Sequence, residues 1–125
     1  MGDFKLKKHK VQEARFCENI EIEKNNDIEV GVQGSILIPK NFELNKNIIV
    51  QLKFRFGKEE ERLFLYLETI SVFEPVDTVT EVDKGVVEKQ CIPVALGELR
   101  KTVKMVTESY GMPPLDLPPF DGEDL

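Results

Sequence analysis

The sequence predicts an α+β fold, in which an antiparallel sheet of four or five strands packs with one long C-terminal helix. Three observations support this prediction. Apolar and polar side chains alternate over residues 48–56, apolar side chains recur at helical spacing within residues 91–110, and four of the seven prolines fall in residues 111–120. We therefore expect a single domain, with the sheet in 1–75, a connection in 76–90, the long helix in 91–110, and a proline-rich strap with an acidic end in 111–125.

The composition is that of a globular protein, and it excludes several classes of function. Hydrophobic residues make up 41% and charged residues 32% of the 125 positions, which is enough to bury a core. The net charge of -6 argues against a general binder of nucleic acid or of anionic membranes, because either needs a dominant basic surface. Cys17 and Cys91 are too few for a disulfide framework, so we expect a reducing cytoplasm. We expect neither a membrane helix nor a signal peptide.

Patterns that carry catalysis or bind cofactors are missing from the sequence. The one histidine, His9, stands between two lysines, and no CxxC, HExxH, GxxxxGK or GxGxxG spacing occurs. An enzyme would have to use scattered carboxylates such as Glu68, Glu74 and Asp77, and acidic residues at strand ends are usually solvated. We therefore predict that the protein is not an enzyme and that it needs no cofactor and no metal.

The first two strands are predicted at residues 4–16 and 28–38. In the first strand Phe4 and Leu6 alternate with lysines, which discourage stray pairing and so indicate an edge of the sheet. In the second strand the apolar residues share one face, and Gly34 in the middle suggests a bulge or a bend.

The next two strands form a predicted hairpin. Every second side chain over residues 48–56 is apolar, and a short turn leads into a partner strand at residues 61–73. Leu65 and Leu67 make one face of this partner strand apolar, and Phe64 and Tyr66 make the other face apolar too. Such a strand is covered on both faces or exposes a patch for a partner.

The helix at residues 91–110 carries one apolar stripe. Pro93 suits its first turn, and Gly111 with the prolines that follow ends it. The stripe consists of Leu99, Val103, Val106 and Tyr110. It packs either on the chain's own sheet or on another subunit, and the spacing leaves both open. Residues 76–90 are polar and mixed and stay unassigned.

The proline-rich strap that follows the helix is expected to be extended. It carries four large apolar side chains, Met112, Leu115, Leu117 and Phe120. Two interpretations stay open. The strap covers the protein's own core, or it forms one wall of an apolar binding groove, and a groove wall can do both.

Two stretches of the C-terminal third carry a family resemblance. Cys91-Ile92-Pro93 stands before the long helix, and Gly111-Met112-Pro113-Pro114-Leu115-Asp116-Leu117-Pro118-Pro119 follows it. This order resembles the SecB family of export chaperones, which place a similar cysteine-x-proline before their long helix and a similar connection after it. Phe4-Lys5-Leu6 also resembles the first strand of that family, and Phe64-Leu65 with Phe73 resembles its fourth.

The resemblance implies a four-stranded antiparallel sheet with helices on one side, assembled as a dimer of dimers. Such proteins bind unfolded clients in apolar grooves and pass export clients to the SecA motor. The expected client-binding residues are Phe16, Ile20, Ile22, Met112, Leu115, Leu117 and Phe120. The expected SecA contacts are Glu13 and Glu68. The expected oligomer interface is Leu99, Val103, Val106 and Tyr110.

Two functional hypotheses follow, and the sequence leaves both open. The first is an ATP-independent holdase chaperone for non-native polypeptides, whose negative charge would favour clients with basic stretches. The second is a dedicated adaptor for a single partner, for example an antitoxin. It is motivated by one departure from the family, because SecB has a second helix after the proline-rich connection and this sequence stops at Leu125.

Overall fold

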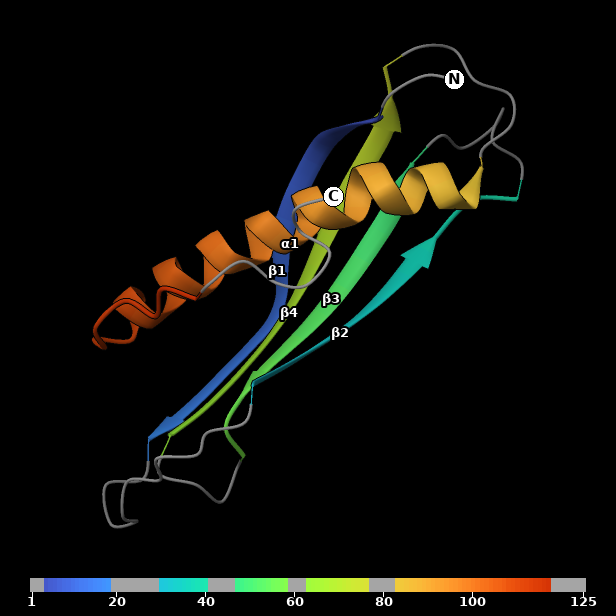
Figure 1. Cartoon of the computed structure of the whole chain (residues 1–125). Coiled ribbons are helices and arrows are strands. Elements are labelled where there is room, and N and C mark those ends of the chain that lie inside the picture. Colours follow the sequence, from blue (N-terminus) through green and yellow to red (C-terminus); the bar gives the residue numbers. More distant parts are fainter. Residues whose placement is uncertain (1–3, 19–29, 41–46, 59–62, 77–82, 118–125) are drawn as a thin grey trace.

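Four antiparallel strands and one long helix make up the described part of the computed structural model, which covers residues 4–18, 30–40, 47–58, 63–76 and 83–117. The elements are β1 (Phe4–Glu18), β2 (Val30–Leu37), β3 (Ile48–Phe56), β4 (Leu63–Pro75) and α1 (Lys84–Ser109). The strands lie in the order β1-β4-β3-β2. The helix crosses one face of the twisted sheet diagonally (Figure 1). The predicted fold class, an α+β fold with a four-stranded antiparallel sheet and one long C-terminal helix, is confirmed.

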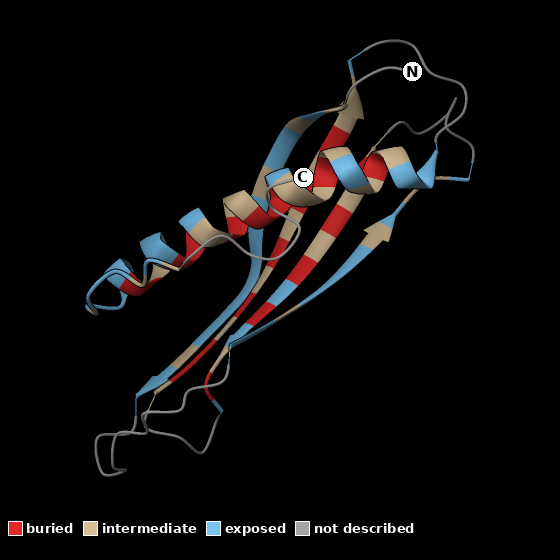
Figure 2. Cartoon of the chain, viewed as in Figure 1, coloured by how far each residue is buried: buried red, intermediate tan, exposed pale blue. Residues whose placement is uncertain are grey.

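The core lies between the helix and the sheet, and the period-two pattern of β3 and β4 places it there. Buried and less buried residues alternate along both strands beneath the helix (Figure 2). The larger buried side chains of this layer are Ile48, Val50, Leu52, Phe54, Leu65, Leu67, Phe73, Leu96, Leu99 and Val103. Because every second residue of each strand enters this one layer, a shift of one residue in the register would turn the apolar set toward solvent.

The helix begins at Lys84 and not at residue 91 as predicted. Asp83 caps it, because its side chain accepts a hydrogen bond of 2.8 Å from the backbone N–H of Gly85. Pro93 therefore lies inside the helix and not in its first turn, although proline costs about 3 kcal/mol in a helix interior. Burial of Val87 and Cys91 against the core offsets that cost, and this tertiary contribution has no strong periodic pattern in the sequence.

The end of the helix agrees with its sequence pattern. Gly111 has a positive φ of 82°, the left-handed conformation that glycine adopts without strain. Backbone hydrogen bonds of 3.0 Å from Gly111 to Glu108 and of 3.1 Å from Met112 to Thr107 close the last turn. The chain then reverses, and the described part of the strap, residues 111–117, runs back beside the helix (Figure 1). Among the described residues, no helix has the combination of length and hydropathy that crossing a membrane requires.

Of the two edges of the described sheet, β1 agrees with its prediction and β2 does not. β1 is an edge strand as predicted, and it carries two register irregularities, at Leu6/Lys8 and at Val11/Glu13. β2 pairs with β3 in unbroken register through Gly34, so the bulge that was one of the two alternatives there is wrong. Gly34 is instead a point of close approach, because a Cβ atom at this position would lie 2.9 Å from Cδ2 of Leu52.

The face of β4 that points away from the helix is apolar but only partly exposed. Phe64 lies on this face and is 2% exposed. The guanidinium groups of Arg15 and Arg55, from the two neighbouring strands, each lie 5.8 Å from the centre of its ring. Cation–π contact and the aliphatic stems of the two arginines thus cover a ring that the helix does not reach.

Candidate functional site

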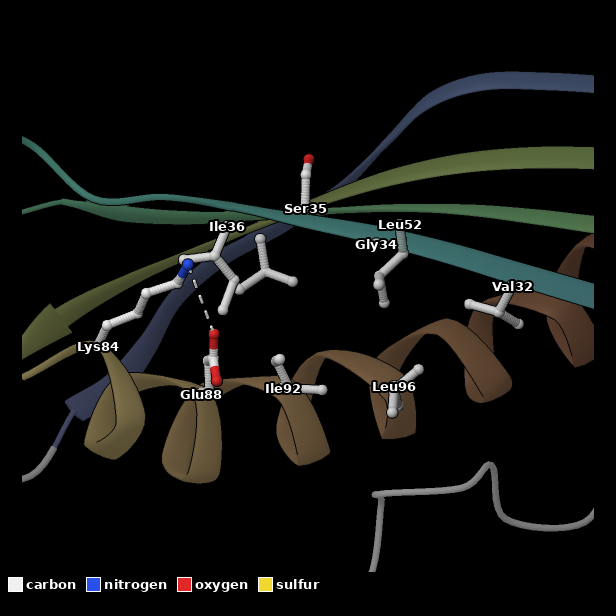
Figure 3. A pocket seen from close by; sticks show the side chains of 10 residues that line it. Val32, Gly34, Ser35, Ile36, Leu52, Lys84, Glu88, Ile92 and Leu96 are labelled. Atoms are coloured by element: carbon white, nitrogen blue, oxygen red, sulfur yellow. Dashed lines mark ion pairs between the residues drawn. The ribbon is translucent and has the colours of Figure 1, made fainter.

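An open groove of about 640 Å³ lies between β2 and the N-terminal half of α1. Figure 3 shows the side chains of Val32, Ile36, Ile92 and Leu96 pointing into it from the two sides. Leu52 of β3 contributes to the groove, and the ion pair between Lys84 and Glu88, 4.0 Å long, stands at one end. The remaining lining residues are Gly34, Ser35 and Val50.

The groove exists because the helix packs on β1, β3 and β4 more than on β2. Val32 and Ile36 are consequently only partly buried, although they belong to the face of the sheet that carries the core. Gly34 stands between them and adds no side chain, and Leu52 of β3 packs closely against it in the middle of the groove. The result is an apolar surface that extends the core to the edge of the sheet.

The outer edge of β2 borders this groove, and no described strand pairs with it. An unpaired edge presents a row of backbone N–H and C=O groups, which proteins usually protect with lysines, prolines or bulges. β2 has none of these devices, because its sequence VGVQGSIL contains no charge and no proline and its register with β3 is regular. The edge is therefore able to pair with an added strand, whose side chains on one face would enter the groove.

The client-binding residues predicted from the sequence fall elsewhere. Phe16 stacks on Tyr110 at the C-terminal end of α1, with 4.7 Å between ring centres. Leu115 and Leu117 pack against the core, and the backbone N–H of Leu115 donates a 2.9 Å hydrogen bond to the Thr107 hydroxyl. These two described residues of the strap thus pack on the protein's own core, which supports the first of its two interpretations.

None of the expected client-binding side chains that the structure describes lines the groove beside β2. Met112 is partly buried at the turn that follows the helix. Ile20, Ile22 and Phe120 lie outside the described residues. The groove residues that the sequence analysis did not select are Val32, Ile36, Leu52, Ile92 and Leu96. The missing charge along residues 30–37, in contrast to the lysines of β1 at the opposite edge of the sheet, is the sequence signal that could have indicated them.

The structure contradicts the expected oligomer interface at two of its four residues. Leu99 and Val103 are 0% exposed and pack on the chain's own sheet, so they offer no surface to another subunit. Val106 is partly buried against the same core. Tyr110 is 42% exposed while it stacks on Phe16. The large apolar side chains that α1 leaves exposed are Val94, Met105 and Tyr110.

Glu13 and Glu68, the expected SecA contacts, lie directly opposite each other in the pairing of β1 with β4. Both point away from the helix, since Leu67 on one side of Glu68 and Thr69 on the other are buried beneath it. Glu68 accepts hydrogen bonds from the side-chain amide of Gln51 and from the hydroxyl of Tyr66, the latter 3.1 Å long. Burial and then the hydrogen bond to Glu68 raise the pKa of Tyr66 above its ordinary value.

His9 joins the sheet to the helix and is not part of the groove. Its Nδ1 lies 2.8 Å from the Ser71 hydroxyl, and its Nε2 lies 2.9 Å from the Thr102 hydroxyl. Because Thr102 already donates to the carbonyl of Glu98, it accepts from Nε2–H of His9, and Nδ1 is left to accept from Ser71. Burial lowers the pKa of His9, while the charge of Glu98 acts in the opposite direction.

The buried cysteine has the properties of a core residue. Cys91 is 0% exposed, and burial raises the pKa of its thiol to about 11. A thiol of such a high pKa is protonated at neutral pH and is a poor nucleophile. The other cysteine, Cys17, is exposed on β1.

Similarity to known proteins lies in the fold. No protein-family model matches the sequence, and no curated protein matches it. Among solved structures, the chain is similar to the Mycobacterium tuberculosis SecB-like chaperone Rv1957, in complex with a ChAD peptide from the HigA1 antitoxin. The TM-score is 0.65 with 10% identity, and the alignment covers 95% of this chain and 91% of that chain. A protein of unknown function from Streptococcus agalactiae aligns with a TM-score of 0.49 and 14% identity, over 94% and 98% of the two chains.

The likeness to the mycobacterial chaperone defines the class of fold. At 10% identity the likeness to the mycobacterial chaperone shows a shared fold and no more, and the element order and sheet topology described above agree with it. The chain has a SecB-like fold.

Proposed function

We propose that this protein is an ATP-independent holdase chaperone that binds extended segments of non-native polypeptides along β2. The observation that carries the proposal is the apolar groove beside an unprotected sheet edge. A client segment pairs its backbone with β2, and every second side chain enters the groove between Val32, Ile36, Ile92 and Leu96.

The size of the groove suits weak and reversible binding. Burying one leucine-sized side chain contributes about 1.5–3 kcal/mol, so two of them contribute about 3–6 kcal/mol before the cost of ordering the client. Because 1 mM corresponds to about 4 kcal/mol, such a contribution gives a dissociation constant between several millimolar and tens of micromolar for a single groove. Such an affinity allows release without an energy source, and several grooves in one oligomer would hold a long client more tightly.

A second candidate is a dedicated adaptor for one polypeptide partner. The similar mycobacterial chaperone was solved with an antitoxin peptide, which favours a short peptide segment as the ligand and makes a single dedicated client an alternative to many. The same groove and edge would serve both functions. The two differ in whether generic unfolded proteins are bound.

Further parts of the proposal rest on the resemblance to SecB. They are a cytoplasmic location, a dimer of dimers, a contribution of the strap residue Met112 to client binding, and a contact with SecA through the neighbouring carboxylates of Glu13 and Glu68. The adjacency of these two carboxylates on the open face of the sheet supports the last of these, because together they form one acidic patch. The proposed function needs no catalytic residue and no cofactor.

The test is the aggregation of a denatured, slow-folding protein that is diluted into buffer without nucleotide. We expect the wild-type chain to suppress aggregation at a ratio of a few subunits to one client. Ile36→Lys places a charge in the groove and is expected to abolish suppression. Val94→Lys adds the same charge at an exposed position on the outside of α1 and is expected to leave suppression intact.

Two results would contradict this proposal. If the folded wild-type protein does not suppress aggregation, the holdase function is wrong and the dedicated adaptor takes its place. If Ile36→Lys is folded and suppresses aggregation as well as wild type does, the groove beside β2 is not the client site. Circular dichroism of each variant shows whether it is folded.

A further inference from the structure

The half of the sheet that ends at the free edge is basic, although the protein as a whole is acidic. β2, β3 and the described residues that flank them, 30–40 and 47–58, contain Lys40, Lys53, Arg55 and Lys58 and no acidic residue. The acidic residues of the described strands all lie on β1 and β4. The net charge of -6 therefore does not describe the residues of β2 and β3 that the structure describes.

Lys53 and Arg55 lie on the face of β3 that points away from the helix. They alternate with Leu52, Phe54 and Phe56, which face the core. Both are exposed, and among the described residues Lys53 has no ion-pair partner. Its cross-strand neighbours are Gln33 on β2 and Glu68 on β4.

The side chains that β2 contributes beside these two cations are small or uncharged. Gly31 lies opposite Arg55, and Gln33 lies opposite Lys53. A hollow of about 420 Å³, bordered by these four residues and by Tyr66, results on this face. Gly31 leaves room for a long side chain to pass, because a Cβ atom there would have no neighbour within 4 Å. Lys53 is thus open toward the free edge of β2, while the guanidinium of Arg55 borders the hollow and also lies over the ring of Phe64 on the β4 side.

A strand that is added to β2 presents its side chains alternately to the two faces of the sheet. One set enters the apolar groove on the helix side. The other set lies on the face of the hollow. Between these side chains and the cations of β3, Lys53 and Arg55, β2 contributes only Gly31 and Gln33, so the long cationic side chains are able to reach across β2. Carboxylates in this second set gain favourable charge contacts, and ammonium groups there are repelled.

We propose that the preferred client segment is an extended strand in which apolar residues alternate with acidic residues. The apolar residues occupy the groove, and the acidic residues lie over the hollow beside Lys53 and Arg55. This inference rests on the proposed function and adds a sequence preference to it. It reverses the expectation from net charge, by which basic clients would be preferred.

The test compares two fluorescently labelled peptides by anisotropy at low ionic strength. They share the same alternating isoleucine and leucine residues, and they carry either glutamate or lysine at every intervening position. We expect the glutamate peptide to bind about tenfold or more tightly than the lysine peptide. Each exposed charge contact is weak, but every contact is attractive for the glutamate peptide and repulsive for the lysine peptide. The difference should shrink as salt is added.

Variants of Lys53 distinguish this local charge contact from an effect of the protein's net charge. Lys53→Glu is expected to remove or invert the preference, and Lys53→Gln, which adds no carboxylate beside Glu68, should reduce it. Lys104→Glu changes the net charge by the same amount at an exposed position of α1 and should leave the preference unchanged. Equal effects of Lys53→Glu and Lys104→Glu would overturn the inference.

The failure of this inference is distinguishable from the failure of the proposed function. If both peptides bind equally and a denatured client displaces them, the β2 site stands and the acidic preference is wrong. If neither peptide binds but aggregation is still suppressed, the preference is likewise wrong. If neither peptide binds and aggregation is not suppressed, both proposals are overturned.

Discussion

The two edge strands of the described sheet, β1 and β2, differ in how well they are protected against pairing with another strand. β1 carries four lysines within its first seven residues and two register irregularities, features that discourage further pairing. It is also fastened to the helix along its length. The backbone N–H of Phe4 donates to the side chain of Gln90, His9 bonds to Thr102, and Phe16 stacks on Tyr110.

β2 has none of these features. It is uncharged and pairs with β3 in regular register, and the side chains that it turns toward the helix line a groove. The helix therefore stabilises the fold mainly through its contacts with β4, β3 and β1. Under the proposed function, the β2 edge is then available for binding. Substitutions on the two sides should therefore separate stability from client binding.

The largest expected effect is on stability, and it is measured by comparing two apolar residues of α1, one in the closed core and one at the open groove. Leu99→Ala removes a fully buried side chain and should lower the free energy of unfolding by about 2–5 kcal/mol. Ile92→Ala, two turns earlier at the groove, should cost less, because Ile92 is only partly buried and already borders open space. Urea denaturation followed by circular dichroism measures both. Equal losses would contradict the distinction between a closed and an open side.

The next effect concerns the strap. Leu115→Ala combined with Leu117→Ala removes two side chains that pack on the core, and we expect a loss of about 1–3 kcal/mol, smaller than for two fully buried leucines. At a temperature where the variant stays folded, suppression of aggregation should match that of wild type. A folded variant that has lost suppression would show that the strap belongs to the client site, and the comparison of the two edges would have to include it.

The smallest effect is the pH dependence that His9 contributes on the β1 side. Burial lowers its pKa in the folded state below the ordinary value of 6.5, so below that pH the unfolded chain takes up a proton that the folded chain does not. The stabilisation is therefore complete above pH 6.5 and is lost as pH falls toward the pKa of the folded state. His9→Gln should flatten the decline below pH 6.5, which urea denaturation at a series of pH values measures. An identical decline in wild type and variant would show that His9 does not titrate as its burial implies.

Local patterns predicted much of this fold. Strict alternation identified β3, and the lysines of β1 identified an edge, because each of these features is written in neighbouring residues. The helix start at Lys84 was missed, since its first turns are held by an N-cap and by the burial of Val87 and not by a repeated apolar stripe. Gly34 was interpreted as a bulge, because the close approach of Leu52 depends on strand pairing that the sequence does not display.

The groove could not be predicted from the sequence, because it depends on contacts between residues that are distant in the sequence. Val32 and Ile36 are far from Ile92 and Leu96 in the sequence, and only the diagonal path of the helix brings the two pairs together (Figure 3). The apolar strap drew attention instead, because its four large side chains are adjacent in sequence. Its packing on the core shows that a concentration of apolar residues marks burial as readily as binding.

The most direct test of the account is hydrogen exchange of the backbone amides, with and without a bound denatured client. If the client adds a strand to β2, amides within Val30–Leu37 should gain protection, and amides within Phe4–Glu18 should change little. Protection gained along β1 and not along β2, or gained on neither edge while the client is bound, would contradict the assignment of the open edge as the client site.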